Sequence, residues 1–113
     1  MAEEFNPTEE GRRIAANYLS KRGWTRQRRQ GLNRQLNAGF QREEFEAKEQ
    51  QCDLVEGEAE EIFSREVERW RQDGSAQAKE VLNKLVEMLG NRTDLGFFAK
   101  RIVERLKREM EPF

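Results

Sequence analysis

Residues 41–72 carry the sequence pattern that most restricts the fold of this chain. Between Phe45 and Trp70, mainly apolar positions recur at steps of three, four and seven residues, which is typical of an imperfect heptad seam. No proline interrupts the stretch. A helix of this length extends about 45 Å, which is longer than a compact domain of 113 residues is wide. We therefore expect one long central helix that pairs with another long helix.

The segment before the long helix is predicted to form two shorter helices. Asn6 is a good N-cap residue and Pro7 suits the first helical position, so the first helix is expected over about residues 7–22. Gly23 would end this helix, because glycine readily adopts the left-handed conformation that follows many helices. The second helix is expected to begin with Thr25 as its N-cap.

The segment after the long helix is predicted to form an αα-hairpin. Gly74 and Ser75 match the end of one helix and the N-cap of the next, which we expect over residues 75–89. Thr93 is the expected N-cap of the last helix, with Asp94 in its first turn, where the helix dipole favours a negative charge. The link between these helices is then three residues long, which is typical of a helical hairpin.

Together these patterns predict an all-α fold of four to five helices in a single domain over residues 1–113. Two prolines and eight glycines are too few for the many turns of a β fold. A break or bend is expected near Gly39, because glycines weaken the helix that leads to it. Residues 1–5 and 110–113 are expected to be frayed.

The residue types that are missing restrict the chemistry. The chain has no histidine and one cysteine, Cys52, which excludes histidine-based nucleophile systems, intrachain disulfides and cysteine-based metal sites. No phosphate-binding glycine motif is present, and the acidic residues do not match the spacing of a calcium loop. We therefore predict no enzyme activity, no metal and no cofactor. Cys52 is expected to act as a small buried apolar residue.

The same composition predicts a cytoplasmic protein without a membrane partner. No apolar run approaches the roughly 20 residues that span a bilayer. The first ten residues are acidic and lack the apolar core of a signal peptide. A single cysteine fits a reducing compartment.

Charge is separated along the chain, although the formal net charge is only -1. Residues 11–42 hold nine basic residues and no acid, whereas residues 43–73 hold twelve acids and four bases. Residues 21–35 alone carry six positive charges and a tryptophan. The residues that we assign to a candidate partner-binding surface are Lys21, Arg22, Trp24, Arg26, Arg28, Arg29 and Arg34.

This basic stretch has four alternative uses. It could be a solvated helix face, or it could fold against the acidic segment and be neutralised within the chain. It could dock on an acidic protein partner, with Trp24 as the anchor. It could also bind nucleic-acid phosphates while Trp24 stacks on a base.

We predict a small non-enzymatic regulatory or adaptor protein that binds a protein partner through the basic surface. The alternative is a nucleic-acid-binding regulator that uses the same residues, and the third hypothesis is a structural protein that self-associates through the long helix. An apolar content of only 35% favours a homodimer or a heteromeric complex, in which a second chain completes the core. The residues that we assign to the oligomer seam are Phe45, Val55, Ile62, Phe63 and Trp70.

Overall fold

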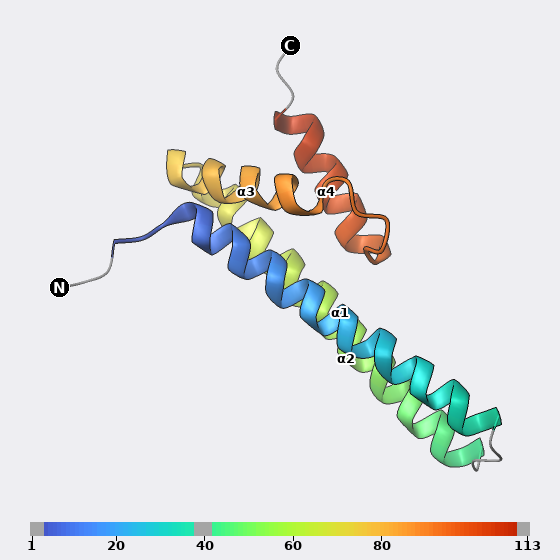
Figure 1. Cartoon of the computed structure of the whole chain (residues 1–113). Coiled ribbons are helices and arrows are strands. Elements are labelled where there is room, and N and C mark those ends of the chain that lie inside the picture. Colours follow the sequence, from blue (N-terminus) through green and yellow to red (C-terminus); the bar gives the residue numbers. More distant parts are fainter. Residues whose placement is uncertain (1–3, 38–41, 111–113) are drawn as a thin grey trace.

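The computed structural model of the chain describes residues 4–37 and 42–110, except for the side chains of residues 35–37, and these residues form four α-helices (Figure 1). In chain order the helices are α1 (Pro7–Asn37), α2 (Arg42–Asp73), α3 (Ala76–Leu89) and α4 (Phe97–Met110). None of the described residues lies in a β-strand. The predicted all-α fold of four to five helices is confirmed at this level.

The long helices α1 and α2 lie side by side along their length and run in opposite directions (Figure 1). α1 has 31 residues and α2 has 32, and α2 covers nearly the same residues as the predicted long helix. The helix with which α2 pairs is thus a second long helix of the same chain. Their hairpin extends well beyond α3 and α4, and the longest dimension of the molecule is 55 Å.

α1 is one continuous helix, so the prediction of two shorter helices with a boundary at Gly23 is wrong. Gly23 and Thr25 lie inside α1, and within the described chain only Gly74 has a left-handed backbone. The Thr25 hydroxyl donates to the carbonyl four residues earlier at 2.9 Å, and the residue is completely buried. A glycine within a helix costs about 1 kcal/mol relative to alanine. Burial of Thr25 and Leu32 along the hairpin offsets this cost. The predicted break near Gly39 lies outside the described residues.

The start of α3 agrees with the prediction, and α3 then packs closely on α1. Gly74 ends α2 with a φ of 68°, and the Ser75 hydroxyl accepts a hydrogen bond from the Ala78 N–H at 3.0 Å. Gly11 of α1 has no side chain to separate the two helices. A Cβ at this position would lie 2.7 Å from the Cβ of Lys84 in α3. The absence of a side chain at Gly11 therefore permits the close crossing of α1 and α3.

α4 begins at Phe97, so the prediction of Thr93 as its N-cap is wrong. Asp94 lies in the connection between α3 and α4, where its carboxylate accepts hydrogen bonds from Arg92 instead of contributing to the first turn of α4. The connection comprises residues 90–96, and α4 is inclined steeply to α3 (Figure 1). The expected three-residue hairpin link is therefore also wrong.

The hydrophobic core lies where all four helices meet, at the N-terminal half of α1 (Figure 1). Fully buried side chains of the core include Phe63 from α2, Leu85 from α3 and Leu106 from α4. The rings of Tyr18 and Phe63 contact each other, with centroids 4.9 Å apart. Cys52 is completely buried outside this core and carries a free thiol, which agrees with its expected placement.

The expected fraying of residues 1–5 and 110–113 stays a prediction. Phe5 stacks on the Trp70 ring with centroids 5.4 Å apart, and Met110 is the last residue of α4. Residues 1–3 and 111–113 lie outside the described part. Among the helices of the described residues, none has both the length and the apolar character that a membrane span requires.

Candidate functional site

The predicted partner-binding surface lies on α1, but its side chains project from two sides of the helix. In an α-helix a step of two residues rotates a side chain by about 200°. One set is spaced by four and three residues and therefore shares one side, which we call the paired flank: Arg22, Arg26 and Arg29. A second set shares a different side of the helix, which we call the open flank: Lys21, Trp24 and Arg28.

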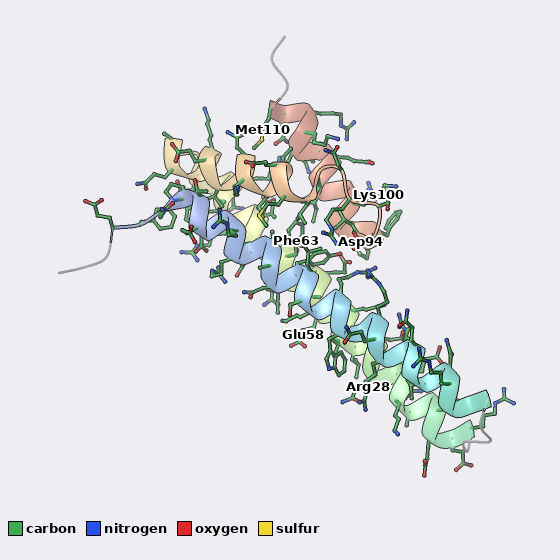
Figure 2. The ribbon with its side chains drawn as sticks, viewed as in Figure 1. Arg28, Glu58, Phe63, Asp94, Lys100 and Met110 are labelled. Atoms are coloured by element: carbon green, nitrogen blue, oxygen red, sulfur yellow. The ribbon has the colours of Figure 1, made fainter. Side chains whose placement is uncertain are left out.

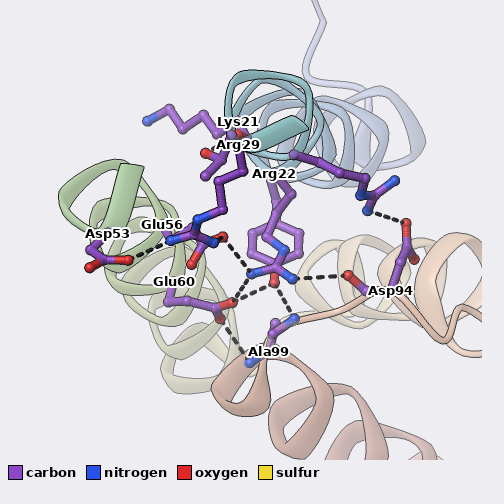
Figure 3. Close-up of polar contacts among 12 residues, drawn as sticks. Lys21, Arg22, Arg29, Asp53, Glu56, Glu60, Asp94 and Ala99 are labelled. Carbon is purple, nitrogen blue, oxygen red and sulfur yellow. Dashed lines mark hydrogen bonds and ion pairs between the residues drawn. The ribbon is translucent and has the colours of Figure 1, made fainter. Parts of the chain in front are cut away.

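The paired flank faces carboxylates of α2 (Figure 3). Arg29 forms ion pairs with both Asp53 and Glu56 through its two terminal nitrogens. The Nη1 atom of Arg22 lies 3.8 Å from a carboxylate oxygen of Glu60 and 4.0 Å from one of Glu56. This part of the basic stretch is therefore neutralised within the chain, as one of the four alternatives supposed.

The paired flank also holds the connection between α3 and α4. The Nη2 atom of Arg26 lies 3.3 Å from the Asp94 carboxylate, and Arg22 donates to the backbone carbonyl of Asp94 at 3.2 Å. The hydrogen bonds from Arg92, and after them the one from Arg26, hold the pKa of Asp94 well below its usual range. Asp94 thus joins the connection to α1.

A largely buried polar cluster, which we call the Tyr18–Glu60 junction, ties α1, α2 and the start of α4 together (Figure 3). The Tyr18 hydroxyl donates to one carboxylate oxygen of Glu60 at 2.6 Å and accepts from the Gly96 N–H at 2.9 Å. The other Glu60 oxygen accepts from the N–H of Ala99, in the first turn of α4, at 3.0 Å. A carboxylate of α2 therefore caps α4, for which the described residues before Phe97 supply no N-cap side chain.

Because of the Tyr18 hydroxyl in this junction, we predict that the protein loses stability at alkaline pH. Burial, and after it the hydrogen bond to Glu60, raises the pKa of Tyr18 well above its usual range. The unfolded chain releases this proton near a pH of about 10, whereas the folded protein keeps it, so stability is fully present below that pH and declines above it. We predict that the free energy of unfolding falls by about 1.4 kcal/mol per pH unit from this one group.

Urea denaturation across this pH range measures the decline. The Tyr18→Phe variant removes the ionisable group but keeps the ring, so it reports the contribution of all other groups, lysines included. The difference between the two proteins should shrink as the pH rises above about 10. A difference that stays constant across that range would contradict the raised pKa.

The open flank carries an exposed tryptophan with an arginine stacked on it. Trp24 is 42% exposed, and the guanidinium carbon of Arg28 lies 5.6 Å from its ring centroid. Figure 2 shows Arg28 on the side of the hairpin away from Asp94 and α4. Among the described residues, neither Arg28 nor the half-buried Lys21 forms an ion pair with a carboxylate. The open flank therefore keeps both its charge and its aromatic surface.

The remaining residues of the two predicted surfaces divide between solvent and core. Arg34 is exposed near the end of α1 and has no ion-pair partner within the described chain. Phe63 is only 1% exposed because its own chain covers it, which favours a place in the core of one chain over a contact with a second copy. Trp70 is half-buried against the core and Phe5. Phe45, Val55 and Ile62 are half-buried on α2, and their contact with a second chain stays a prediction.

One surface was missed by reasoning from the sequence, namely a groove between α2 and α4. It has a volume of about 580 Å³, and Phe98 and Ile102 line it from α4. The arginines that line it are Arg65, Arg101, Arg105 and Arg108. The sequence does contain a signal for this surface. Phe98 and the α4 arginines follow one another at steps of three, four and three residues, which places them on one side of the helix beside its apolar stripe.

No protein-family model, curated protein or solved structure matches this chain. Its own side chains are therefore the basis for assigning a function. Within the described part of the chain, two surfaces combine exposed aromatic rings with positive charge that no described carboxylate pairs with, namely the open flank of α1 and the groove between α2 and α4.

Proposed function

We propose that this chain is a small non-enzymatic regulatory or adaptor protein that binds an acidic protein partner through the open flank of α1. Trp24 is the anchor that enters the interface, and Arg28 is the principal charged contact. Lys21 extends the positive surface along the open flank, and the exposed Arg34 adds a positive charge near the end of the helix. The observation that carries the proposal is the exposed Trp24 with the guanidinium of Arg28 over its ring.

The chemistry of this pair favours a protein interface. Tryptophan and arginine are the residues most enriched among those that contribute strongly to protein–protein binding. Stacking on Trp24 restricts the side chain of Arg28 before binding, so less conformational entropy is lost when a carboxylate pairs with it. Trp24 keeps 42% of its surface exposed, and burial of this exposed part against a partner would be favourable.

The paired flank has a different role in this proposal. Arg22, Arg26 and Arg29 already contact carboxylates of the same chain, so they position α1 against α2 and the connection to α4. An acidic substitution at Arg29 would place a third negative charge beside Asp53 and Glu56 and destabilise the hairpin. Substitutions at the paired flank therefore cannot separate binding from folding, and the test uses the open flank.

We predict that the double variant Trp24→Ala/Arg28→Ala folds normally and loses its partner. Proteins captured from a lysate by the wild-type chain are identified, purified and titrated against each variant by calorimetry. Loss of an anchor that contributes about 2 kcal/mol to binding raises the dissociation constant about 30-fold. The matched control is Arg12→Ala/Leu54→Ala, which truncates one exposed arginine and one exposed apolar residue elsewhere. Equal affinity of both double variants for the purified partner would refute the assignment.

The nucleic-acid alternative uses the same exposed ring, since a base can stack on Trp24. It predicts that fluorescence anisotropy of labelled DNA or RNA detects binding that weakens steeply between about 50 and 200 mM salt. Within the described residues the paired flank is neutralised, which reduces the number of phosphates that α1 can contact. Tight, salt-sensitive binding that is lost in Trp24→Ala/Arg28→Ala would favour this alternative over a protein partner.

A further inference from the structure

The groove between α2 and α4 has an apolar side and a floor of small residues. Gly57 and Ser64 lie on α2 seven residues apart, which places them on the same face two turns from each other. Phe98 and Ile102 line the opposite wall, one turn apart on α4. An added Cβ at Gly57 would meet no atom of the described residues within 4 Å, so the floor of the groove is open at this point.

Two phenylalanine rings stand exposed beside this groove. Phe98 is 61% exposed and Phe97 is 68% exposed, and their rings meet edge to face with centroids 5.5 Å apart. The other large apolar residues of α4 are buried or half-buried in the core. A partner that covers the two rings would remove a considerable apolar area from water.

The arginines around the groove are not all neutralised within the chain. Arg65 pairs with Glu61, and the Nε atom of Arg105 lies 3.3 Å from a carboxylate oxygen of Glu109. Arg101 instead lies over the ring of Phe97, with its guanidinium carbon 5.5 Å from the centroid. No ion pair to a carboxylate engages Arg101 or Arg108 in the part of the chain that the structure describes.

The acids that line the groove do not compensate these two charges. The Glu60 carboxylate points into the Tyr18–Glu60 junction, where it accepts hydrogen bonds from Tyr18 and Ala99 (Figure 3). Glu61 is engaged by Arg65. The rim of the groove therefore keeps a positive excess from Arg101 and Arg108.

We propose that this groove binds an acidic amphipathic helix of a partner protein. An apolar side chain of that helix would pack between Phe98 and Ile102, and carboxylates one turn away would pair with Arg101 and Arg108. A concave site between two helices fits the convex surface of a third helix better than the flat surface of a membrane. Its apolar wall fits an apolar side chain better than a phosphate backbone.

The groove is independent of the proposed docking face on α1. It shares no residue with the open flank, and Figure 2 shows Lys100 of α4 and Arg28 on different sides of the hairpin. A chain that loses binding at Trp24 can therefore retain binding at Phe98, and the reverse. The result of one test does not decide the other.

The test uses a panel of fluorescein-labelled synthetic helices of about four turns, with leucine, phenylalanine or tryptophan along one face and glutamate on the other. Fluorescence anisotropy gives the dissociation constant for the full-length protein. We expect at least one member of the panel to show saturable binding. Its dissociation constant should rise about tenfold or more in Phe98→Ala and in Arg101→Glu/Arg108→Glu. The same peptide with lysine in place of glutamate should not bind.

Lys100→Glu supplies the matched control, because Lys100 is exposed on the same helix but does not line the groove. The Lys100→Glu variant makes the net charge of the protein more negative but leaves the groove unchanged. The affinity of this variant for the peptide should therefore stay within about twofold of that of the wild type. Circular dichroism checks that each variant keeps its helix content, which we expect because Phe98 and Arg101 are exposed.

Three outcomes overturn the proposal. The first is the absence of saturable binding across the whole panel. The second is equal weakening by Lys100→Glu and Arg101→Glu/Arg108→Glu, which would indicate non-specific attraction. The third is binding that depends on Phe98 and the arginines but occurs only with vesicles of phosphatidylserine and phosphatidylcholine, or only with labelled oligonucleotides.

Discussion

Phe63→Ala is expected to lower the free energy of unfolding by about 3–5 kcal/mol, which is the usual effect of removing a buried phenylalanine. Phe63 is 1% exposed and contacts the ring of Tyr18 in the centre of the four-helix core. Neighbouring side chains relax only partly into the space that is left, because protein interiors are close-packed. The loss would be a large fraction of the stability of a domain of this size.

Urea denaturation followed by circular dichroism measures this loss. Leu54→Ala is the matched control, because Leu54 lies on the same helix but is 74% exposed, and its truncation should change the stability by no more than about 0.5 kcal/mol. Equal effects of the two substitutions would mean that α2 does not pack against the other helices through Phe63.

The same variant tests the hypothesis that the chain self-associates through the long helix. If Phe63 belonged to a contact between copies, Phe63→Ala would lower the oligomer mass while each chain stayed folded. If it belongs to the core of one chain, the variant loses stability and its oligomer mass stays that of the wild type. Light scattering under native conditions distinguishes these results, and the burial of Phe63 within one chain favours the second.

The elements that were predicted correctly depend on local residue patterns. The long helix α2 was recognised from its apolar spacing, and the boundary between α2 and α3 from adjacent residues with strong preferences, Gly74 and Ser75. The boundary assigned to Gly23 rested on equally local rules and was wrong. In α1 the contact with α2 stabilises a continuous helix, and no local rule includes that contact.

The start of α4 shows the same limit in a different form. Thr93 and Asp94 are good capping residues, but the first turn of α4 is capped by Glu60 of α2, 39 residues from Ala99 in sequence. Asp94 is instead bound by Arg92 and Arg26. A cap supplied by another helix leaves no trace in the residues next to the boundary.

The candidate site could be predicted only in part for a related reason. The sequence shows that residues 21–35 are basic, but which arginines meet acids depends on the register of α1 against α2. Once α1 is one helix, the spacing of Arg22, Arg26 and Arg29 places them on one side, and Trp24 and Arg28 on another. The error about Gly23 therefore also concealed the division of the surface.

Glu60→Ala should lower the free energy of unfolding by about 2–4 kcal/mol, because it leaves two donors at a largely buried site without an acceptor. The Tyr18 hydroxyl and the Ala99 N–H would each lose their hydrogen bond, and Arg22 would lose a carboxylate 3.8 Å away. The matched control is the adjacent Glu61→Ala. Its carboxylate is 59% exposed and, among the described residues, pairs with exposed Arg65 alone, so a change within about 0.5 kcal/mol is expected.

A double-mutant cycle with Tyr18→Phe shows whether the junction acts as a unit. If the Tyr18 hydroxyl and Glu60 stabilise the fold through each other, the double variant should lose about 1 kcal/mol less than the two single variants together. Hydrogen exchange adds an independent readout, because loss of Glu60 should increase exchange at the first turn of α4 more than in α3. Additive losses with unchanged exchange at Ala99 would show that α4 is held by its apolar face alone.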